Sequence, residues 1–569
     1  MQEATVRADL VGALPAAGGW EPLDSFPAAA ELLTSRRLAQ ITWALIGLGI
    51  VVRLIRYLLQ FPLWPDEAYL AHNYLDRGYL DLLKPLDYIQ IAPLLYLWVQ
   101  HTIIKLFGFS EYSLRLYVLL CGIGSLFLFR HLAGRLLRGT AFLLAVGTFA
   151  MAYPLIRHSA EAKPYGSDLF VSLVLLTLAV EWCRRRQESR WWWALTLVVP
   201  IACLLSYPAV FVASGISATM AIVLWRQRLW RQWLRWGLFN VALLAGFVTL
   251  FMLSARNQMN ASGPAQRAAF SDDFPPLDAV GKFLAFLAVR TNELMCYPVG
   301  GELGPNLLTS LCCLTALVLL LRRRRIALAA LCVVPLALHF LAATVHAYPY
   351  GGSWRLSVYM APIFCLLMGL GAAAILSKLN SRRSALTPVV VALILLVAVG
   401  VGASVRDFLK PYKEPCWMRN RDFARWFWCE KAQDAELVCL RTDLHKCFYS
   451  PPQGDDLASV YYCNQRIYSA RHARGEAADL GRVSSSRPLR YVRFRPARTT
   501  EREEDAFRQW LKTRQSQYQL VGEEKYPLSF WVKQDLVCLD RVEIYEFVPK
   551  ESLAVLGAAD STSARAAQP

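Results

Sequence analysis

The sequence predicts an α-helical polytopic membrane protein, with about 11 transmembrane helices, further helices at the outer interface, and a C-terminal soluble α/β domain. Three observations predict this fold class: an apolar composition, long apolar runs within residues 39–405, and basic clusters between those runs. Hydrophobic residues make up 55% and charged residues 18% of the 569 residues, and the mean hydropathy is +0.32. Soluble domains average about 45–50% apolar and about 25% charged residues. The composition therefore disfavours a wholly soluble protein.

The formal net charge of +18 falls mainly in the apolar part of the chain, because residues 1–405 carry +14 and residues 406–569 carry only +4. Basic loops between apolar runs are typical of membrane proteins, whereas a nucleic-acid-binding protein gathers its basic residues on one polar face. We therefore expect the lipid bilayer as a partner and no nucleic acid.

Residues 1–38 are aperiodic and lack the order of segments found in a signal peptide, so we expect a flexible cytoplasmic tail. A bilayer core of about 30 Å needs about 20 apolar residues as a helix. Eleven runs of suitable length follow the tail: 39–60, 113–133, 139–157, 165–183, 191–206, 208–225, 236–254, 305–321, 326–346, 354–377 and 386–405.

The positions of the basic clusters predict the orientation of these runs. Cytoplasmic loops of membrane proteins carry the excess of Lys and Arg. With eleven spans and a cytoplasmic N-terminus, every cluster falls on the cytoplasmic side. The clusters are Arg36 with Arg37, Arg130 with Arg135 and Arg138, 184–186 with Arg190, Arg226 with Arg228, Arg231 and Arg235, 322–325, and Lys378 with Arg382 and Arg383.

A further apolar run, 92–107, would export the later clusters if it were a twelfth span, so we expect it to be a helix at the outer interface. This topology leaves the segments 61–112, 158–164, 255–304 and 347–353 outside, together with everything after residue 405. We expect a multi-pass protein of the inner (cytoplasmic) membrane whose C-terminal domain is periplasmic or extracytoplasmic.

Residues 406–550 change to a mixed polar and apolar pattern that indicates a small α/β domain. Strand-like runs occur at 436–440, 491–494, 530–532 and 542–548, and a polar helical run at 501–513. Residues 551–569 are rich in Ala and Ser and indicate a disordered tail. Six of the 14 cysteines lie in this outer part. Because no CxxC pair appears, disulfides or buried thiols are favoured over a zinc site, and the connectivity stays open.

The first outer segment begins with two adjacent carboxylates, Asp66 and Glu67, directly after the first span. Neighbouring residues on a helix point about 100° apart, so the two need not share one task. Asp66 can face a cavity while Glu67 caps the helix start, where carboxylates are favourable. The alternative is that both are solvated charges at a helix N-terminus.

Two more outer segments carry unusual polar residues. His158, Glu161, Lys163 and Tyr165 lie at one membrane boundary, where Glu161 and Lys163 are either site residues or an ordinary interfacial ion pair. Arg355 opens a later span from the outside, against the positive-inside trend, and Arg binds phosphate with a bidentate fork. The alternative for Arg355 is a contact with lipid headgroups.

Tyr359 lies one helical turn after Arg355, on the same face. Asp272 and Asp273, in the loop 255–304, are also candidates, although nothing in their spacing requires them. His72 and His101 are better explained as structural or interfacial residues than as metal ligands.

Together these segments resemble the polyprenyl-phosphate-sugar-dependent glycosyltransferases of the GT-C fold, in particular the branch of protein O-mannosyltransferases and lipid A aminoarabinose transferases. The resemblance covers 39–405, which would then be the GT-C-like transmembrane glycosyltransferase domain. The residues that carry it are Trp64-Pro-Asp-Glu-Ala-Tyr69, Gln90-Ile-Ala-Pro-Leu94, Phe107-Gly-Phe-Ser-Glu-Tyr-Ser-Leu-Arg115, Glu161-Ala-Lys-Pro-Tyr165, and Arg355 with Tyr359 and Pro362. The chain departs from some members at the second acidic position, where they have Asp and this chain has Glu161.

The resemblance implies a sugar donor on a polyprenyl phosphate and an acceptor hydroxyl of a lipid, glycan or protein. It implies Asp66 as the general base of an inverting displacement, with Glu67 and Glu161 as further catalytic carboxylates. Lys163 and Arg355 would bind the donor phosphate. The substrate-binding candidates are Tyr69, Tyr165, His158 and Tyr359.

No cofactor is expected with certainty. Some relatives use a divalent metal, for which Glu67, Glu161 or His158 would be the ligands, but their spacing is not a metal signature. Two other functions remain open from the sequence: a polytopic transporter or lipid flippase with an outer accessory domain, and a membrane-anchored binding protein. A transporter should carry mid-membrane charges or broken spans in paired halves, whereas the polar residues here gather at one face.

Overall fold

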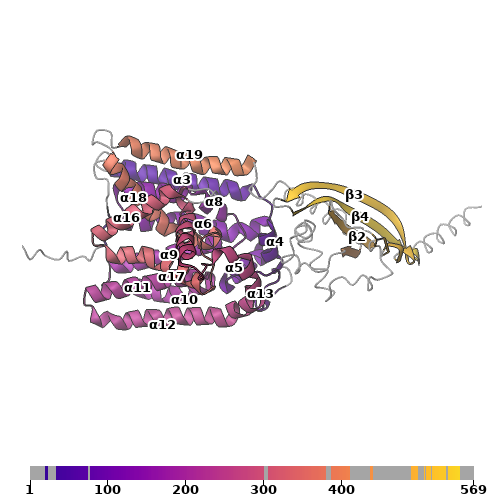
Figure 1. The fold of residues 1–569 in the computed structure, drawn as a ribbon, viewed down its shortest axis with the longest axis horizontal. Helices are drawn as coiled ribbons and strands as arrows, with labels where there is room; N and C mark the ends of the chain where they lie inside the picture. Colours follow the sequence, from indigo (N-terminus) through magenta and orange to yellow (C-terminus); the bar gives the residue numbers. More distant parts are fainter. Residues whose placement is uncertain are drawn as a thin grey trace, which may run out of the picture. The chain divides into compact units, whose positions relative to one another are not determined.

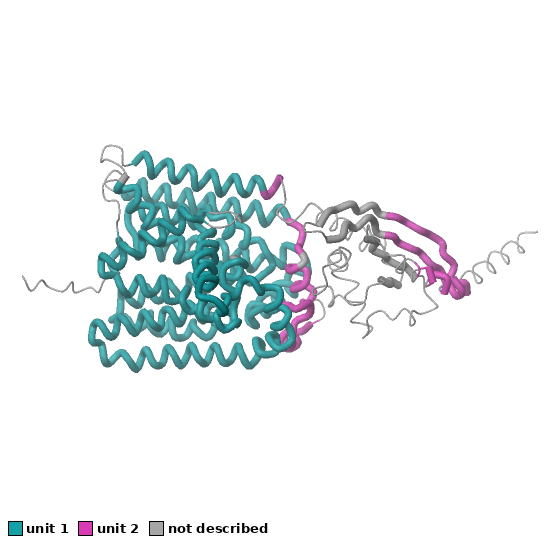
Figure 2. The backbone as a smooth tube through the Cα atoms, viewed as in Figure 1, with its two compact units in different colours: residues 1–60, 91–406 teal, residues 61–90, 407–569 magenta. Residues whose placement is uncertain are grey.

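The computed structural model describes residues 20–23, 34–74, 77–299, 306–379, 386–409, 436–439, 489–496, 505, 508–509, 511–513, 515–532 and 536–551. These residues form two compact units, coloured separately in Figure 2. Unit 1 comprises residues 1–60 and 91–406, and unit 2 comprises residues 61–90 and 407–569. The segment 61–90, expected within the domain 39–405, is thus grouped with the C-terminal residues.

Unit 1 is a helical bundle (Figure 1). Its longer helices are α3 (Ser35–Leu58), α5 (Leu94–Phe107), α6 (Glu111–Leu136), α7 (Gly139–Met151), α9 (Tyr165–Arg184), α10 (Ser189–Leu205), α11 (Ala209–Arg226), α12 (Trp233–Leu250), α13 (Arg256–Ala269), α14 (Val280–Leu294), α16 (Leu307–Arg322), α17 (Ile326–Thr344), α18 (Ala361–Leu379) and α19 (Leu386–Leu409). The short ones are α8 (Tyr153–His158), α15 (Cys296–Val299), η2 (Trp230–Gln232), the π-turn η3 (Phe251–Ala255), η4 (Ser271–Asp273) and η5 (Trp354–Met360).

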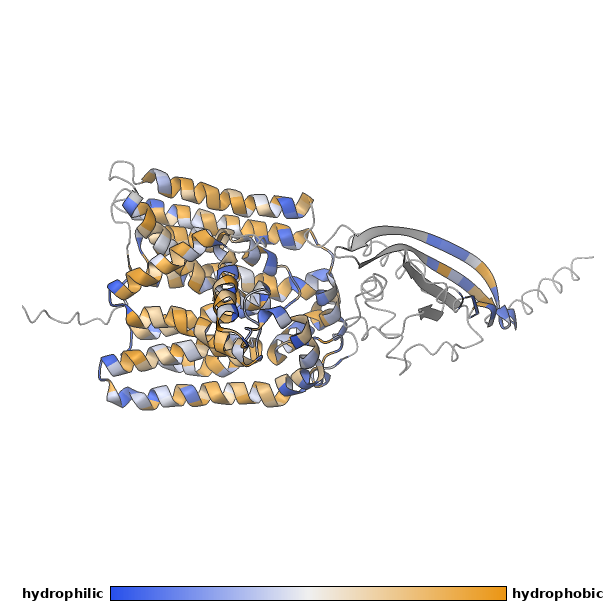
Figure 3. Ribbon diagram, viewed as in Figure 1, coloured by the Kyte–Doolittle hydropathy of each residue, from blue (hydrophilic) through white to orange (hydrophobic). Residues whose placement is uncertain are grey.

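Each of the eleven predicted apolar runs is helical, and the run 92–107 is present as α5. Among the described residues, eight helical stretches are long and apolar enough to cross a membrane, and α5, α7, α10 and α16 are shorter apolar helices. Figure 3 shows the apolar character along the bundle. The chain is a multi-span membrane protein, as the sequence predicts.

Two elements differ from the sequence prediction. The run 139–157 is broken between α7 and α8, because Pro154 in the first turn of α8 has no N–H for a continuous helix. The segment after residue 254, expected as a loop, instead continues the preceding helix, so that Trp230–Ala269 forms one helical stretch.

Helix α9 lies at the centre of the bundle, where 83% of its membrane-spanning window is buried. It packs against α6, α10, α11 and η5. Helix α18 packs closely on α7, since a Cβ at Gly369 would lie 2.5 Å from the backbone nitrogen of Ala145. Small residues permit such close approach of helices in membranes. In contrast, only 11% of the corresponding window of α19 is buried, which suits a lipid-facing position.

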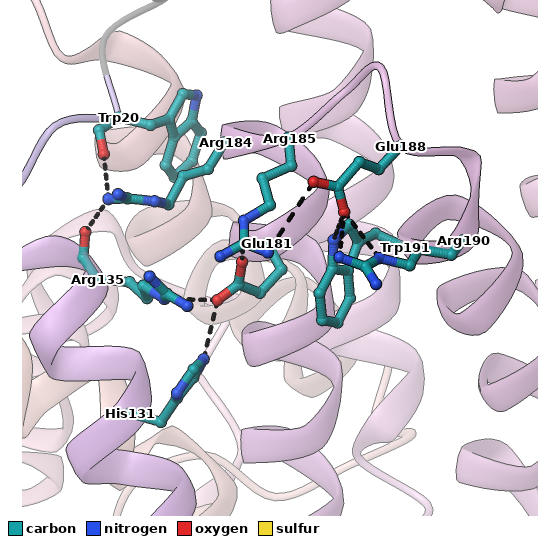
Figure 4. Close-up of polar contacts among 9 residues, drawn as sticks. All are labelled: Trp20, His131, Arg135, Glu181, Arg184, Arg185, Glu188, Arg190 and Trp191. Atoms are coloured by element: carbon teal, nitrogen blue, oxygen red, sulfur yellow. Dashed lines mark hydrogen bonds and ion pairs between the residues drawn. The ribbon is translucent and has the colours of Figure 1, made fainter.

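A polar cluster ties together the ends of α6 and α9 that carry two of the predicted cytoplasmic arginine clusters (Figure 4). Glu181 is buried, and its Oε1 lies 2.8 Å from His131 Nε2 and 2.6 Å from Arg135 Nε. Arg185 Nε lies 3.4 Å from the other carboxylate oxygen. A buried charge needs such partners, because its removal from water is costly. We call these four residues the Glu181 cluster.

Residues 20–23, within the tail expected to be flexible, are docked beside this cluster. Trp20 and Leu23 are buried, and Arg184 Nη1 donates to the Trp20 carbonyl at 2.9 Å. The amide of Leu23 donates to the carbonyl of Leu136 at 2.8 Å, and the amide of Arg138 donates to the carbonyl of Leu23 at 2.9 Å. The expectation of a flexible tail is therefore wrong for these four residues, because an apolar anchor and backbone pairing hold them.

Unit 2 contains α4 (Pro65–His72), η1 (Asp81–Leu83) and a four-stranded sheet in the order β1-β2-β4-β3. The strands are β1 (Glu436–Cys439), β2 (Leu489–Pro496), β3 (Tyr518–Val532) and β4 (Leu536–Pro549). β1 and β2 are parallel, and the other two pairs are antiparallel. The four predicted strand-like runs all coincide with these strands.

The cysteines follow the division of the chain. The eight in unit 1 are all free and buried, as expected of small apolar residues in a helical bundle. The six later cysteines lie outside the residues whose side chains the structure describes, as do residues 552–569 of the predicted tail.

Candidate active site

Helix α4 of unit 2 carries the two adjacent carboxylates, and they have different surroundings. Pro65 occupies its first turn, where a missing N–H costs nothing. Glu67 is buried at 2% exposure, and its Oε2 accepts from the Trp64 amide at 3.2 Å. Glu67 therefore caps the start of the helix, as expected for the case in which Asp66 alone faces a cavity.

Asp66 is half-buried, and its Oδ1 accepts from the side-chain amide of Gln90 at 3.2 Å. The two residues before Gln90 have left-handed backbone, with φ of 58° at Tyr88 and 59° at Ile89. This conformation is costly for a β-branched residue such as Ile89, and strained backbone of this kind gathers at functional sites. Gln90 is thus held beside Asp66 at an energetic cost.

Aromatic side chains complete the surroundings of α4. The ring of Tyr69, a predicted substrate-binding residue, is buried and stacks on Tyr88 with centroids 5.3 Å apart. His72 contacts the same ring at 5.4 Å. Tyr69 and His72 therefore support the strained segment.

In unit 1, the second predicted segment forms the turn between α8 and α9. Glu161 is buried, with Oε1 accepting from Arg157 Nε at 2.8 Å and Oε2 lying 2.8 Å from His158 Nδ1. His158 also contacts the ring edge of Tyr165 at 5.2 Å. Lys163 is buried at 5% exposure. The structure thus brings together four of the predicted site residues: His158, Glu161, Lys163 and Tyr165.

Arginines from three helices surround this turn. Arg56 of α3 interacts electrostatically with Glu161, and with Arg115 of α6 and Arg157 of α8. Arg115 and Arg157 are buried, at 3% and 4% exposure. Arg157 thus pairs with the Glu161 carboxylate, Arg56 interacts with Glu161 and Arg115, and Lys163 follows two residues after Glu161 in the chain. We call Arg56, Arg115, Arg157, His158, Glu161 and Lys163 the Glu161 cluster.

Such a cluster has an excess of positive charge in a largely buried place, which suits an anion such as a phosphate. The sequence analysis named Arg115 as part of a motif but assigned it no role, and it missed Arg56 and Arg157. The available signal was the occurrence of arginines near the outer ends of three predicted spans, where the positive-inside rule disfavours them.

The third predicted segment is η5, which packs against α9. Arg355 is half-buried at its start. Tyr359 is fully buried, and its carbonyl accepts from the Ser172 hydroxyl of α9 at 2.7 Å. The hydroxyl of Tyr348 donates to the carbonyl of Leu356 at 3.0 Å. Hydrogen bonds from both sides therefore fix the backbone that carries Arg355.

Tyr348 also connects η5 with the start of α9. Burial raises the pKa of the Tyr348 phenol well above its ordinary value, and interactions with Asp168 and Tyr165 add to the shift. The phenol therefore stays protonated and can donate its hydrogen bond. Asp168 is a buried carboxylate that the sequence analysis did not single out.

These predicted residues fall into two groups. Unit 1 holds His158, Glu161, Lys163, Tyr165, Arg355 and Tyr359, whereas unit 2 holds Asp66, Glu67 and Tyr69. The candidate ligands for a divalent metal do not fit that role. Both oxygens of Glu161 are engaged by Arg157 and His158, Glu67 caps α4, and the described residues contain no group of three or more His, Cys, Asp or Glu placed to hold a metal ion.

Comparisons with known proteins bear on the family and the fold. Residues 92–255 match the family model described as dolichyl-phosphate-mannose-protein mannosyltransferase. The structure is similar to that of ArnT from Cupriavidus metallidurans bound to undecaprenyl phosphate, with a TM-score of 0.50 and 13% sequence identity, over 88% of this chain and 97% of that one.

Two weaker structural matches carry no argument. The apo state of the same ArnT gives a TM-score of 0.47 with 13% identity, over 89% of this chain and 98% of that one. The oligosaccharyltransferase of Archaeoglobus fulgidus, tethered with an acceptor peptide, gives 0.40 with 10% identity, over 74% and 63%. No curated protein matches the chain by sequence. The family match over residues 92–255 and the fold shared with ArnT support the resemblance to GT-C fold glycosyltransferases of the protein mannosyltransferase and ArnT type.

Proposed function

We propose that the chain transfers a sugar from a polyprenyl phosphate to an acceptor hydroxyl on the extracytoplasmic side of the inner membrane, with inversion at the anomeric carbon. The observation that carries this proposal is the Glu161 cluster, where Arg157 pairs with the Glu161 carboxylate and Arg56 interacts with Glu161, Arg115 and Arg157. A buried site with surplus cations favours an anionic ligand, and a lipid-linked sugar brings a phosphate to the membrane surface.

In the proposed reaction, the acceptor oxygen attacks the anomeric carbon as the bond from that carbon to the phosphate oxygen breaks. Asp66 takes the acceptor proton as general base. The polyprenyl phosphate leaves with an additional negative charge, which Lys163, Arg355 and the arginines of the Glu161 cluster stabilise. Tyr69, Tyr165, His158 and Tyr359 are the proposed contacts to substrate.

The surroundings of the three carboxylates support different roles for them. Asp66 is half-buried beside Gln90, which suits a base that reaches a substrate. Glu67 is a helix cap, and Glu161 holds Arg157 and His158 in place. We therefore propose Asp66 as the single catalytic carboxylate, with Glu67 and Glu161 as positioning residues.

The lipid partner is proposed on the same grounds. The ArnT structure contains undecaprenyl phosphate, and apolar side chains of this chain are exposed along α12 and α19, as expected of surfaces that face acyl chains. The acceptor is a hydroxyl of a lipid, glycan or protein.

Transfer of labelled sugar from a polyprenyl-phosphate donor by the purified protein in lipid tests the proposal. We expect Asp66→Asn to lower the rate about 100-fold or more, because general base catalysis contributes about 10²–10⁴-fold. Asp81→Asn, on an exposed carboxylate that pairs with Lys84, is the control and should keep full activity. Full transfer by Asp66→Asn would remove the proposed base, and movement of the lipid without any transfer would favour a flippase.

A further inference from the structure

The turn 350–353, which comes just before Arg355, is bonded at both ends to one acidic residue far away in the sequence. Tyr350 donates its amide to the carbonyl of Asp273 at 2.9 Å. Ser353 donates its amide to Asp273 Oδ2, also at 2.9 Å. The Asp273 side chain is only 8% exposed. One residue thus fixes the turn through its backbone and its side chain.

Ser353 is the N-cap residue of η5, and its carbonyl accepts from the Leu356 amide at 2.9 Å. The orientation of Ser353 therefore sets where η5 begins. Arg355 lies in the first turn of η5. A shift of the Ser353 backbone would be passed directly to the Arg355 side chain.

Arg290 of α14 holds Asp273 from the other side. Its Nη2 lies 3.7 Å from Asp273 Oδ1 and donates to the Asp272 carbonyl at 2.7 Å. Its Nη1 donates to Glu293 Oε2 at 2.8 Å. The guanidinium group therefore bridges η4 and α14, which keeps the carboxylate of Asp273 aimed at the turn.

The two glycines of the turn fit against this pair of side chains. Gly351 has a φ of +93°, and a Cβ there would lie 2.5 Å from Arg290 Cβ. At Gly352, a Cβ would overlap the Asp273 carboxylate. Only glycine allows so close an approach. The geometry of the turn is therefore matched to Asp273 and Arg290.

We infer that Asp273, held by Arg290, is a positioning residue for Arg355, and so sets the affinity of the enzyme for the phosphate of its lipid donor. This inference rests on the proposed function, in which Arg355 binds that phosphate. Asp273 does not itself touch the phosphate; it acts through the Ser353 amide and the start of η5. Positioning of this kind matters because a bidentate phosphate contact depends on the direction of the guanidinium fork.

A double-mutant cycle with undecaprenyl phosphate as the probe tests the inference on the full chain in lipid nanodiscs. The variants are Asp273→Ala, Arg355→Ala and the double variant, and Asp272→Ala is the matched control, because it removes the same group from an exposed neighbour. The dissociation constant is measured by native mass spectrometry, and the folded state by thermal unfolding.

We expect Asp273→Ala and Arg355→Ala each to weaken binding by about tenfold, and Asp272→Ala to change it by less than about twofold. The double variant should bind no more weakly than Arg355→Ala, because residues that act through one contact are not additive. Asp273→Asn, which keeps an oxygen for the Ser353 amide, should lose less. If Asp273→Ala does not fold, Asp273→Asn replaces it in the same double-mutant cycle.

Three results would overturn the inference, and they are distinguishable. Binding by Asp273→Ala at the level of Asp272→Ala would show that the turn does not depend on Asp273. A double variant that loses the product of both single effects would show that Asp273 acts apart from Arg355. Unchanged binding by Arg355→Ala would instead remove the phosphate role of Arg355 in the proposed function, and the inference with it.

Discussion

Glu161 shows how single residues in this protein depend on partners from several helices. Its two oxygens are engaged by Arg157 and His158, while Arg56 and Arg115 add positive charge from two other helices. The sequence predicted Glu161 from its place before Lys163 and Tyr165. No spacing pattern connects Arg56 with Glu161, because the two meet only when α3 packs beside α8. The available signal for Arg56 was its place near the outer end of a predicted span. A local motif was therefore found, and its tertiary partners were not.

The first prediction at this scale concerns Glu161→Gln. The substitution keeps the volume of the side chain but leaves buried arginine charge without its counter-charge, so we expect the free energy of unfolding to fall by about 3 kcal/mol. Glu188→Gln is the control, because the Glu188 side chain pairs with Arg190 and is itself 41% exposed. There we expect little or no change in the free energy of unfolding, because an exposed ion pair contributes little to stability. Thermal unfolding of both variants measures the difference, and equal small losses would contradict a buried cluster.

The second prediction concerns Asp273 and pH. Burial raises the pKa of its carboxyl above the ordinary value of 3.8, although Ser353 and Arg290 oppose the shift and Glu293 adds to it. Protonation removes the charge that Arg290 pairs with. The affinity for undecaprenyl phosphate should therefore have its full value above the raised pKa of Asp273 and fall as the pH drops through that pKa.

The dissociation constant for undecaprenyl phosphate is measured between pH 7 and pH 4. At each pH, the value for the wild type is divided by the value for Asp273→Asn. Titration of the lipid phosphate is common to both proteins and cancels in this ratio. A ratio that does not change with pH would show that the charge of Asp273 has no part in binding.

At the scale of elements, the helices were predictable because burial in a membrane demands long apolar runs. Where the helices break and which polar side chains they bury depends on single residues within these apolar runs. Pro154 divides one run into α7 and α8, and Glu181 lies buried near the end of α9 within a run that reads as apolar. The docked segment 20–23 was not predicted, since four residues provide no periodic pattern. Only the packing of Trp20 and the pairing of Leu23 reveal it.

This docked segment leads to the third prediction. Trp20→Ala removes the apolar anchor and leaves three hydrogen bonds to the backbone, two at Leu23 and one from Arg184 to the carbonyl of residue 20. These are too few to order four residues against their conformational entropy. We expect a protease added to inside-out vesicles to cut the variant near residue 20 much faster than the wild type, with sugar transfer unchanged. Trp230→Ala, at an exposed tryptophan, is the control. Equal cleavage rates for both variants would show that Trp20 does not anchor the segment.

For the whole molecule, the number of crossings decides on which side the C-terminal unit lies. The eight long apolar stretches alone are an even number and would leave both chain ends on one side, whereas the eleven predicted spans are odd and separate them. The positions of both ends of the short helix α7 favour a crossing. It begins beside Leu137, which pairs with the docked segment near the Glu181 cluster, and it leads through α8 into the Glu161 cluster. Helix α6 connects the same two clusters, through Arg115 near its start and Arg135 near its end.

The last prediction follows from this argument. Most residues of α7 are buried within the bundle, so a length of 13 residues need not match the thickness of the lipid. If α7, α10 and α16 all cross, a reporter enzyme that is active only outside the cytoplasm should be active when fused after residue 409 and inactive when fused after residue 187. A cytoplasm-dependent fluorescent protein at the same two positions should give the opposite pattern. Activity at both positions or at neither would mean an even number of crossings between them, so one of the short helices would have to be withdrawn from the membrane-spanning set. Inactivity at both positions would place the C-terminal sheet on the cytoplasmic side, opposite to the one on which the proposed acceptor is bound.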